Sequence, residues 1–192
     1  MNLSTLTPYI DKNLDLQTIK QNLNLYTTIL LEWNQTHNLT GAQSAQDIQK
    51  NIIDSLYPLC FLRDFELCLD VGSGAGFPAI ALAIAKPKQE FILSEPRAKR
   101  AAFLLFVKQK LKLHNIHIEK KSIQEIHTKA DLITSRAVMP TSKLLHLCSK
   151  NLTHNGYYLL YKGELSATLP NNLKSQIFKR DERIYLYIKG EI

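Results

Sequence analysis

The sequence has no long apolar run. Its longest uninterrupted apolar stretches, residues 79–85 and 101–107, are seven residues each, whereas a helix that spans a bilayer needs about 20. The first twenty residues also contain Asp11, Lys12 and Asp15, where a secretory signal would have an apolar segment. We therefore expect no membrane span and a location in the cytoplasm.

Cysteine is equally scarce. The three cysteines, Cys60, Cys68 and Cys148, are an odd number in apolar surroundings, and none belongs to a C-x-x-C pair. This pattern favours reduced thiols in the core over disulfides. The six histidines form no H-E-x-x-H pattern and show no pairing with cysteine. We therefore expect no metal site.

Acidic residues are fewer than basic ones. The chain has 24 Lys and Arg against 17 Asp and Glu, a net charge of +7. The excess is concentrated between Arg97 and Lys121, where eight basic residues accompany the single acid Glu119. A positive surface of this kind suits a polyanion such as nucleic acid. A solvated helix face explains the band equally well, so charge alone leaves the partner open.

Periodic apolar patterns are plentiful. Apolar residues at three- and four-residue steps predict an amphipathic helix over 15–33 and a second over 47–56. From residue 65 onward, short β-like runs alternate with helical patterns. The predicted strands are 65–71, 90–94, 116–119, 131–134, 156–161, 176–178 and 183–188, and the predicted helices among them are 78–85, 98–111, a short 122–126 and 143–150.

This alternation predicts an α/β fold with a mostly parallel seven-stranded sheet. Only a few residues separate the last two strands, so we expect them to form an antiparallel hairpin at the sheet edge. Residues 1–60 then form a helical N-terminal extension packed on a core of residues 61–192. The chain shows no flexible linker, so we interpret it as one compact unit.

The sharpest local motif is Asp-Val-Gly-Ser-Gly-Ala-Gly-Phe-Pro at 70–78, which directly follows the first predicted strand. Its glycines allow a tight turn and close approach of a ligand. A dinucleotide fingerprint would need glycine where Phe77 stands, and no Walker lysine follows. The spacing G-x-G-x-G after Asp70 resembles the first motif of Rossmann-like methyltransferases. Glu95 ends the next strand, where such folds place a carboxylate for the ribose hydroxyls.

Further motifs make the resemblance more specific. They are Ala-Lys-Arg at 98–100, Thr-Ser-Arg-Ala-Val at 134–138, Tyr-Lys-Gly at 161–163, and in the N-terminal part Trp-Asn at 33–34, Asn-Leu-Thr at 38–40 and Asp-Ser-Leu at 54–56. Together with the glycine motif, they resemble the RsmG (GidB) family over most of the chain. That family methylates N7 of a guanine in the 530 loop of bacterial 16S ribosomal RNA, on a class I S-adenosylmethionine-dependent methyltransferase fold.

The resemblance implies S-adenosylmethionine as cofactor and assigns roles to matching positions. It implies that the cofactor is bound by Asp70, Gly72, Ser73, Gly74, Gly76, Phe77, Glu95, Ile123, Gln124 and Arg136. Ser135 and Arg136 would face the methyl group and the incoming base as catalytic residues. The RNA-binding positions would be Lys99, Arg100, Arg136 and Lys162. The implied partner is 16S ribosomal RNA within the small ribosomal subunit, bound by a monomer.

Three positions depart from the family pattern. The family usually has Arg, Glu and His where this chain has Ser122, Gln124 and Asn51. Two main alternatives to an RNA methyltransferase stay open at this point. One is a methyltransferase for a small molecule or a protein, which would not require the basic band. The other is a noncatalytic RNA-binding module that has lost the cofactor, and a nicotinamide oxidoreductase is a more distant third.

Overall fold

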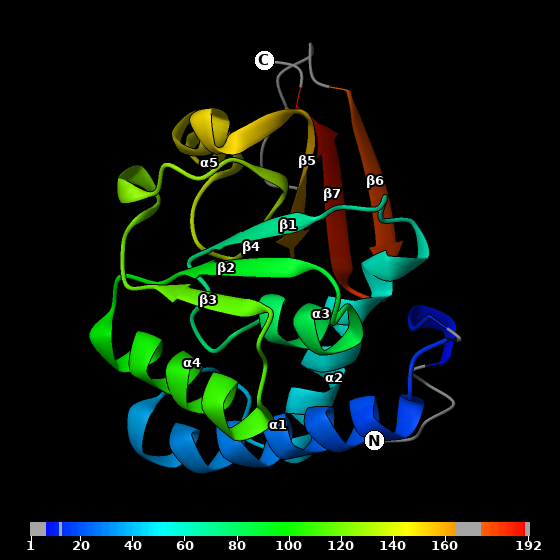
Figure 1. The fold of residues 1–192 in the computed structure, drawn as a ribbon, viewed down its shortest axis with the longest axis vertical. Helices are drawn as coiled ribbons and strands as arrows, with labels where there is room; N and C mark the ends of the chain where they lie inside the picture. The colour runs from blue at the N-terminus through cyan, green and yellow to red at the C-terminus, as the bar shows by residue number, and fades with distance from the viewer. Residues whose placement is uncertain (1–6, 12, 164–173, 191–192) are drawn as a thin grey trace.

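The computed structural model describes residues 7–11, 13–163 and 174–190. They form one seven-stranded sheet with helices on both faces (Figure 1). The helices are α1 (Leu16–His37), α2 (Ala45–Leu56), α3 (Ala79–Ala85), α4 (Ala98–Leu111) and α5 (Thr141–Cys148). The strands are β1 (Leu67–Val71), β2 (Glu90–Ser94), β3 (Ile116–Glu119), β4 (Ala130–Arg136), β5 (Leu152–Lys162), β6 (Ser175–Arg180) and β7 (Arg183–Lys189).

The strand order is β3-β2-β1-β4-β5-β7-β6. The first five strands pair in parallel, whereas β7 pairs antiparallel with both β5 and β6. This arrangement confirms the predicted mostly parallel sheet with an antiparallel edge hairpin. The order reverses between β1 and β4, which is the place where open α/β sheets bind ligands at the carboxyl ends of their strands.

The N-terminal helices have strong local end signals. The Asp15 side chain accepts a hydrogen bond from the Gln17 N–H and so caps α1, which ends at Asn38 in the left-handed conformation. Ser44 and Asp47 form a capping box at the start of α2. Side-chain caps satisfy backbone N–H groups that have no partner within the helix. The segment between the two helices therefore has a defined geometry.

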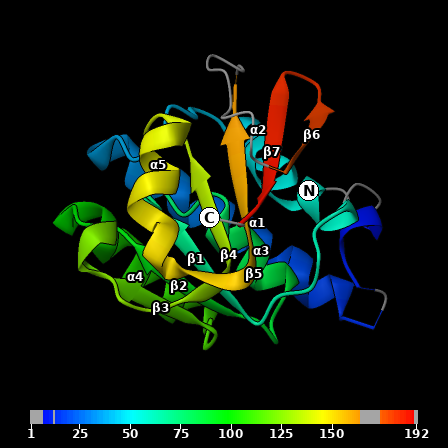
Figure 2. The same ribbon diagram turned by 90° about the horizontal axis from the view of Figure 1, so that it is seen from above.

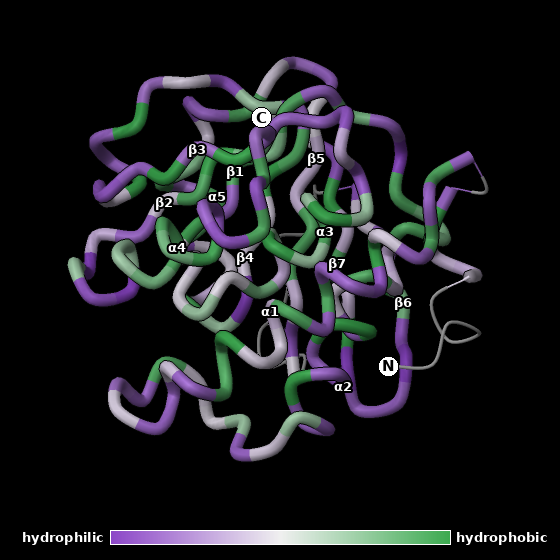
Figure 3. The backbone as a smooth tube through the Cα atoms, turned by 60° about the horizontal axis from the view of Figure 1, so that its bottom comes forward, coloured by the Kyte–Doolittle hydropathy of each residue, from purple (hydrophilic) through white to green (hydrophobic). Residues whose placement is uncertain are grey.

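Two apolar clusters lie on opposite faces of the sheet. Helices α1 to α4 cover one face and α5 covers the other, as two perpendicular views show (Figures 1 and 2). Hydrophobic stretches, in green, occur in the interior, while many of the outer turns are hydrophilic, in purple (Figure 3). The larger cluster includes Tyr26 of α1, Ile52 of α2 and Phe91 of β2, so the N-terminal helices share their core with the sheet.

Two local expectations are wrong. Residues 122–126 do not form an α-helix but the 3-10 helix η4 (Ile123–Glu125), because the capping box of Ser122 and Glu125 closes one tight turn and the chain then returns to extended conformation. Cys60 is exposed, because it ends the 3-10 helix η3 (Tyr57–Cys60), in which Pro58 occupies the buried side. Cys68 and Cys148 are buried and free, as expected.

Among the described residues, none of the helices combines the length and the apolar character needed to cross a membrane.

Candidate functional site

The glycine motif forms the loop between β1 and α3. Gly72, Gly74 and Gly76 have φ values of 70°, 55° and 96°, which L residues with side chains rarely adopt. At Gly76 a Cβ atom would lie 2.5 Å from Ile80 Cγ1 and 3.1 Å from the Tyr26 hydroxyl. Only glycine fits there, because both the backbone conformation and the surrounding packing exclude a side chain.

Helix α1 supports this loop from below. The buried Tyr26 hydroxyl donates a hydrogen bond of 2.6 Å to the Ala75 carbonyl oxygen. Its ring also makes an edge contact with Phe77, with centroids 5.5 Å apart. Helix α1 thus holds the glycine loop in place through Ala75 and Phe77.

Glu95 directly follows β2, and its side chain binds the glycine loop that follows β1. Its side chain is buried, and its two carboxylate oxygens accept hydrogen bonds of 2.9 Å each from the Gly74 and Arg97 backbone N–H groups. A carboxylate has about four acceptor positions, so two remain for hydroxyl groups of a ligand. This geometry suits the ribose role implied for Glu95.

Asp70 lies beneath the loop at 1% exposure. Its Oδ1 accepts a hydrogen bond of 2.7 Å from the Thr134 hydroxyl, while Oδ2 has no hydrogen-bond partner among the described residues. Burial raises the pKa of the Asp70 carboxyl to about 7, and the nearby charge of Glu95 acts in the same direction. This carboxyl therefore titrates closer to neutral pH than an exposed aspartate does.

Arg136 ends β4 and faces the loop from the opposite side. Its Nη2 donates a hydrogen bond of 2.5 Å to Asn51 Oδ1 on α2, and its Nη1 lies 3.4 Å from Asp54 Oδ2. The guanidinium carbon is 5.5 Å from the centre of the Phe77 ring. Burial lowers the pKa of Arg136 and the charge of Asp54 opposes that shift, and an arginine remains charged in proteins.

Asp54 joins three elements through one carboxylate. Besides its ion pair with Arg136, it accepts hydrogen bonds from Arg183 Nε at 3.0 and 3.2 Å and from the Tyr185 hydroxyl at 2.6 Å. Arg183 and Tyr185 belong to β7. One carboxylate therefore balances two guanidinium groups, and the cluster keeps a net positive charge beside the glycine loop.

These elements enclose a cleft of about 560 Å³. Of the residues predicted from sequence, Gly72, Ser73, Gly74, Phe77, Glu95, Arg100 and Arg136 line it. The lining also contains Leu39, Thr40, Asn51, Ala75, Pro96, Arg97, Ala137 and Val138. Three arginines thus face a cleft whose one lining carboxylate, Glu95, is held by backbone N–H groups.

Other predicted residues lie beside or away from this cleft. Asp70, Gly76 and Ser135 lie close to it in the chain but are not among its lining residues, and the Ser135 hydroxyl donates to the Val71 carbonyl oxygen at 3.2 Å. Ile123 is buried and Gln124 exposed in η4. Their contact with the cofactor stays a prediction.

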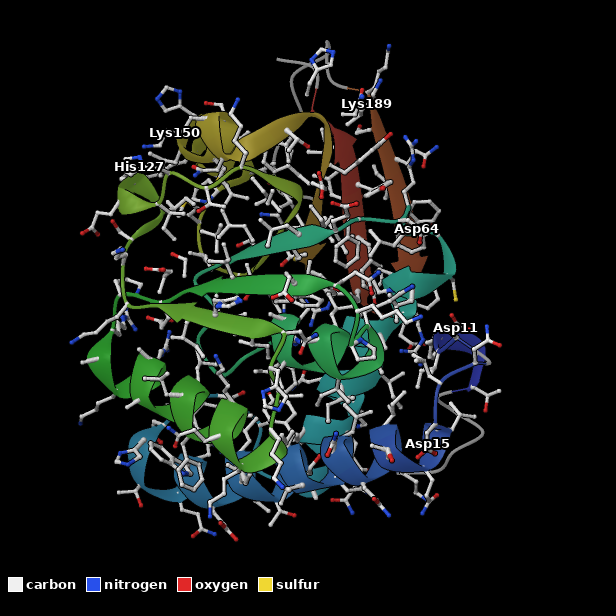
Figure 4. The ribbon with its side chains drawn as sticks, in the orientation of Figure 1. Asp11, Asp15, Asp64, His127, Lys150 and Lys189 are labelled. Carbon is white, nitrogen blue, oxygen red and sulfur yellow. The ribbon has the colours of Figure 1, made fainter. Side chains whose placement is uncertain are left out.

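Lysine positions are more peripheral. The Gln124 carbonyl accepts a hydrogen bond from Lys150, which Figure 4 labels near His127 at the α5 side of the molecule. Lys99 is exposed on α4 and does not line the cleft. Lys162 ends β5, where its Nζ lies 3.5 Å from the Met139 carbonyl oxygen and burial lowers its pKa. The RNA-binding roles of Lys99 and Lys162 stay predictions.

Comparison with known proteins decides the family. The GidB family, described as rRNA small subunit methyltransferase G, matches residues 19–187. Ribosomal RNA small subunit methyltransferase G of Helicobacter pylori is 48% identical over 168 residues, covering 86% of this chain and 94% of that protein. The protein of the same name from Wolinella succinogenes is 50% identical over 145 residues, covering 75% of each.

The chain belongs to the GidB family. Its expected class, an S-adenosylmethionine-dependent methyltransferase, is thereby confirmed. The fold agrees: a solved methyltransferase from Geobacter sulfurreducens superimposes with a TM-score of 0.63 at 10% identity, covering 86% of this chain and 90% of that one. A Rossmann-like methyltransferase core is the fold predicted from the sequence.

The cleft of this GidB member fits its cofactor. An added Cβ at Gly74 would have no neighbour nearer than Arg100 Nη1 at 3.7 Å, so the space above this glycine is open to a ligand. Glu95 lies beside that space with free acceptor positions for hydroxyl groups. Backbone that a ligand can approach and a fixed carboxylate next to it are what a nucleoside with a ribose requires.

Several residues that line the cleft were not predicted as site residues from the sequence. Thr40 and Asn51 were assigned only to the family pattern of the helical extension, and Arg97 only to the basic band. Val138 lies against the loop so closely that a Cβ at Gly72 would approach its Cγ2 to 2.6 Å. The one available signal was the family motif at 134–138, which contains Val138 but does not show its contact with Gly72.

Proposed function

We propose that this chain transfers the methyl group of S-adenosylmethionine to N7 of a guanine in the 530 loop of 16S ribosomal RNA. The observation that carries the proposal is the cleft itself, in which the cofactor loop and the three arginines Arg97, Arg100 and Arg136 face one another. Family membership supports small-subunit ribosomal RNA as the substrate. We further propose that the chain acts in the cytoplasm, as a monomer, on RNA assembled in the small subunit.

The cofactor supplies an electrophilic methyl group on a positively charged sulfur. Gly72, Gly74 and Phe77 would hold its amino-acid portion, and Glu95 would accept the ribose hydroxyls. The N7 atom of guanine has a free lone pair at neutral pH, so the protein does not need a general base to create the nucleophile. Its task is to place the base in line with the methyl group.

Arg136 is the group best placed to orient the acceptor. Asn51 and Asp54 restrict its guanidinium, and Phe77 lies against it. Arginine recognises the O6 and N7 edge of guanine, but N7 must face the methyl group. We assign Arg136 to O6 or to a neighbouring phosphate oxygen, because a cation next to N7 itself would oppose the positive charge that the base acquires.

The test is methyl transfer from labelled S-adenosylmethionine to small ribosomal subunits that lack the modification. Strand cleavage specific for N7-methylguanine locates the product. The wild type should modify one guanine of the 530 loop. Glu95→Ala should weaken binding of S-adenosylhomocysteine about 100-fold, because two charge-assisted hydrogen bonds and the ribose contacts are lost.

A second variant separates acceptor placement from cofactor binding. Arg136→Ala should bind S-adenosylhomocysteine within about threefold of the wild type but transfer methyl about 100-fold more slowly, the usual scale for losing a preorganised donor. Lys129→Ala is the matched control, because Lys129 is exposed and directly precedes β4, at the end of the strand opposite to Arg136. Cofactor binding without transfer to ribosomal RNA would contradict the proposal and favour a small-molecule or protein acceptor.

A further inference from the structure

A second hollow lies beside the cofactor cleft, on the N-terminal extension. It encloses about 690 Å³ between the last turns of α1 and the segment that follows. Its polar lining consists of the side-chain amides of Asn34, Gln35, Asn38 and Gln43 and of Thr40, next to Gly41. We call it the amide hollow. Thr40 also lines the cofactor cleft, so the two spaces are neighbours.

The walls of the amide hollow are fixed by hydrogen bonds. The Asn34 side chain donates from Nδ2 to the Ala42 carbonyl oxygen at 2.9 Å and accepts at Oδ1 from the Thr40 N–H, also at 2.9 Å. Asn38 adopts a left-handed conformation, and its N–H bonds the Asn34 carbonyl oxygen. A segment tied in this way presents a preformed surface, which lowers the entropy cost of binding.

The lining of the amide hollow combines the apolar Leu31 with five polar side chains, and none of the described residues that line it is charged. The side-chain amides of Gln35, Asn38 and Gln43 are exposed and have no hydrogen-bond partner within the described part of the chain. Each amide offers donors and an acceptor together. That combination matches the edge of a nucleobase, which also carries both, better than it matches a phosphate or an apolar side chain.

We propose that the amide hollow binds the base of an unpaired RNA nucleotide adjacent to the target guanine. The inference rests on the proposed function, because it places the guanine in the cofactor cleft. The RNA backbone would then pass Arg97 and Arg100, which line the same cleft as Thr40, and these cations suit its phosphates. Single-stranded RNA is recognised in this way, with splayed bases bonded at their edges.

Gly41 provides a sharp test of the amide hollow. An added Cβ at Gly41 has no heavy atom within 4 Å, so Gly41→Glu adds a negative charge at the lining of the hollow without a steric conflict at Cβ. Gln21→Glu is the control with the same change of charge, because Gln21 is exposed on α1 and does not line the hollow. A double variant, Gln35→Ala with Gln43→Ala, removes amides without adding charge.

The measurement is the Kd for unmodified small ribosomal subunits in the presence of S-adenosylhomocysteine, with methyl transfer recorded in parallel. Gly41→Glu and the double variant should each raise this Kd about tenfold or more, with unchanged Kd for S-adenosylhomocysteine and unchanged urea unfolding. Gln21→Glu should stay within twofold of the wild type, allowing about that much for surface charge.

The outcomes separate the two proposals. If both hollow variants bind subunits as tightly as Gln21→Glu does, the amide hollow is not an RNA site and the inference is overturned. If the hollow variants lose affinity but the wild type transfers no methyl to the subunits, the hollow is supported and the proposed function fails. A wild-type chain that does not bind subunits at all overturns both.

Discussion

The two walls of the cofactor cleft are built in different ways. The glycine wall, residues 72–77 with 95–100, comes from two short segments. Its backbone N–H groups are bonded within these segments and to β2, as Gly72 and Ser73 are to the Ser94 carbonyl oxygen, and the Tyr26 hydroxyl of α1 adds one long-range contact. The arginine wall, formed by Thr40, Asn51 and residues 136–138, is held by side chains from distant parts of the chain. Asn51 and Arg136 are 85 residues apart in sequence.

Because of this difference, the two walls tolerate different substitutions. In the glycine wall, the backbone conformation itself forms the binding surface, and side chains are excluded at Gly76. In the arginine wall, one guanidinium depends on α2 for position and on Asp54 for charge balance. We infer that the glycine wall sets cofactor affinity and that the arginine wall sets acceptor geometry.

The largest expected effect is on the arginine wall. Asp54→Ala leaves the guanidinium groups of Arg136 and Arg183 without their shared carboxylate. It also removes the side-chain acceptor of the Tyr185 hydroxyl, which keeps only its bond to the backbone carbonyl oxygen of residue 54. Breaking a buried ion pair costs about 3–5 kcal/mol. We expect about 3 kcal/mol, because the two arginine side chains are still 16% and 25% exposed.

Urea unfolding followed by circular dichroism measures this change. Glu119→Ala is the control, because Glu119 forms an ion pair with Lys121 in which both side chains are substantially exposed, and such pairs contribute about 1 kcal/mol at most. Equal losses of stability in Asp54→Ala and Glu119→Ala would show that the Asp54 cluster does not hold the arginine wall.

The next effect, smaller per pH unit, concerns Asp70 beneath the glycine wall. The pKa of Asp70 is about 7 in the folded chain against a usual value of 3.8. Between these values the folded chain retains a proton that the unfolded chain releases, so the free energy of unfolding falls as pH rises from about 4 to about 7. The slope is at most about 1.4 kcal/mol per pH unit for one proton.

Asp70→Asn should remove this dependence while keeping the shape of the side chain and an acceptor for the Thr134 hydroxyl. Urea unfolding at pH 5, 6, 7 and 8 without cofactor measures it. The variant should gain stability over the wild type with each step up to about pH 7 and then keep a constant lead. Parallel pH curves for the two chains would mean that Asp70 titrates normally.

The two walls differ in how far the sequence predicts them, because a local motif leaves a signal in the sequence and a long-range contact does not. Strands β2 and β3 and helix α4 have the predicted bounds, because the apolar residues of each recur at the spacing of a strand or a helix. The glycine motif and Glu95 were also recognised, since their spacing is local. The burial of Cys60 and the helix over 122–126 were predicted wrongly. Both segments form single 3-10 turns, which are too short to show a regular spacing of buried residues.

Partners separated by long stretches of chain leave no such periodic signal. The sequence indicates that Arg136, at the end of an apolar strand, needs a partner, but it does not name Asn51. Arg183 and Tyr185 meet Asp54 only because the edge hairpin pairs antiparallel with β5 and brings β7 toward α2. Contacts of this kind depend on the strand order, which the pattern of elements does not specify.

The smallest expected effect is a fall in the rate of methyl transfer, caused by a change confined to the arginine wall. Asn51→Ala removes the acceptor of Arg136 Nη2 while leaving Asp54 and its partners in place. We expect kcat for methyl transfer to fall about tenfold, equivalent to about 1.4 kcal/mol, the size of one charge-assisted hydrogen bond. The Kd for S-adenosylhomocysteine should change less than about threefold, because the glycine wall is intact.

Two further variants distinguish positioning from general damage to α2. Gln46→Ala is the control, because Gln46 is exposed on the same helix and should leave kcat unchanged. Asn51→Asp retains an oxygen acceptor for the guanidinium and should restore most of the lost rate. If Asn51→Asp is as slow as Asn51→Ala, or if cofactor affinity falls together with kcat, Asn51 does not act by orienting Arg136, and the division of labour between the two walls is wrong.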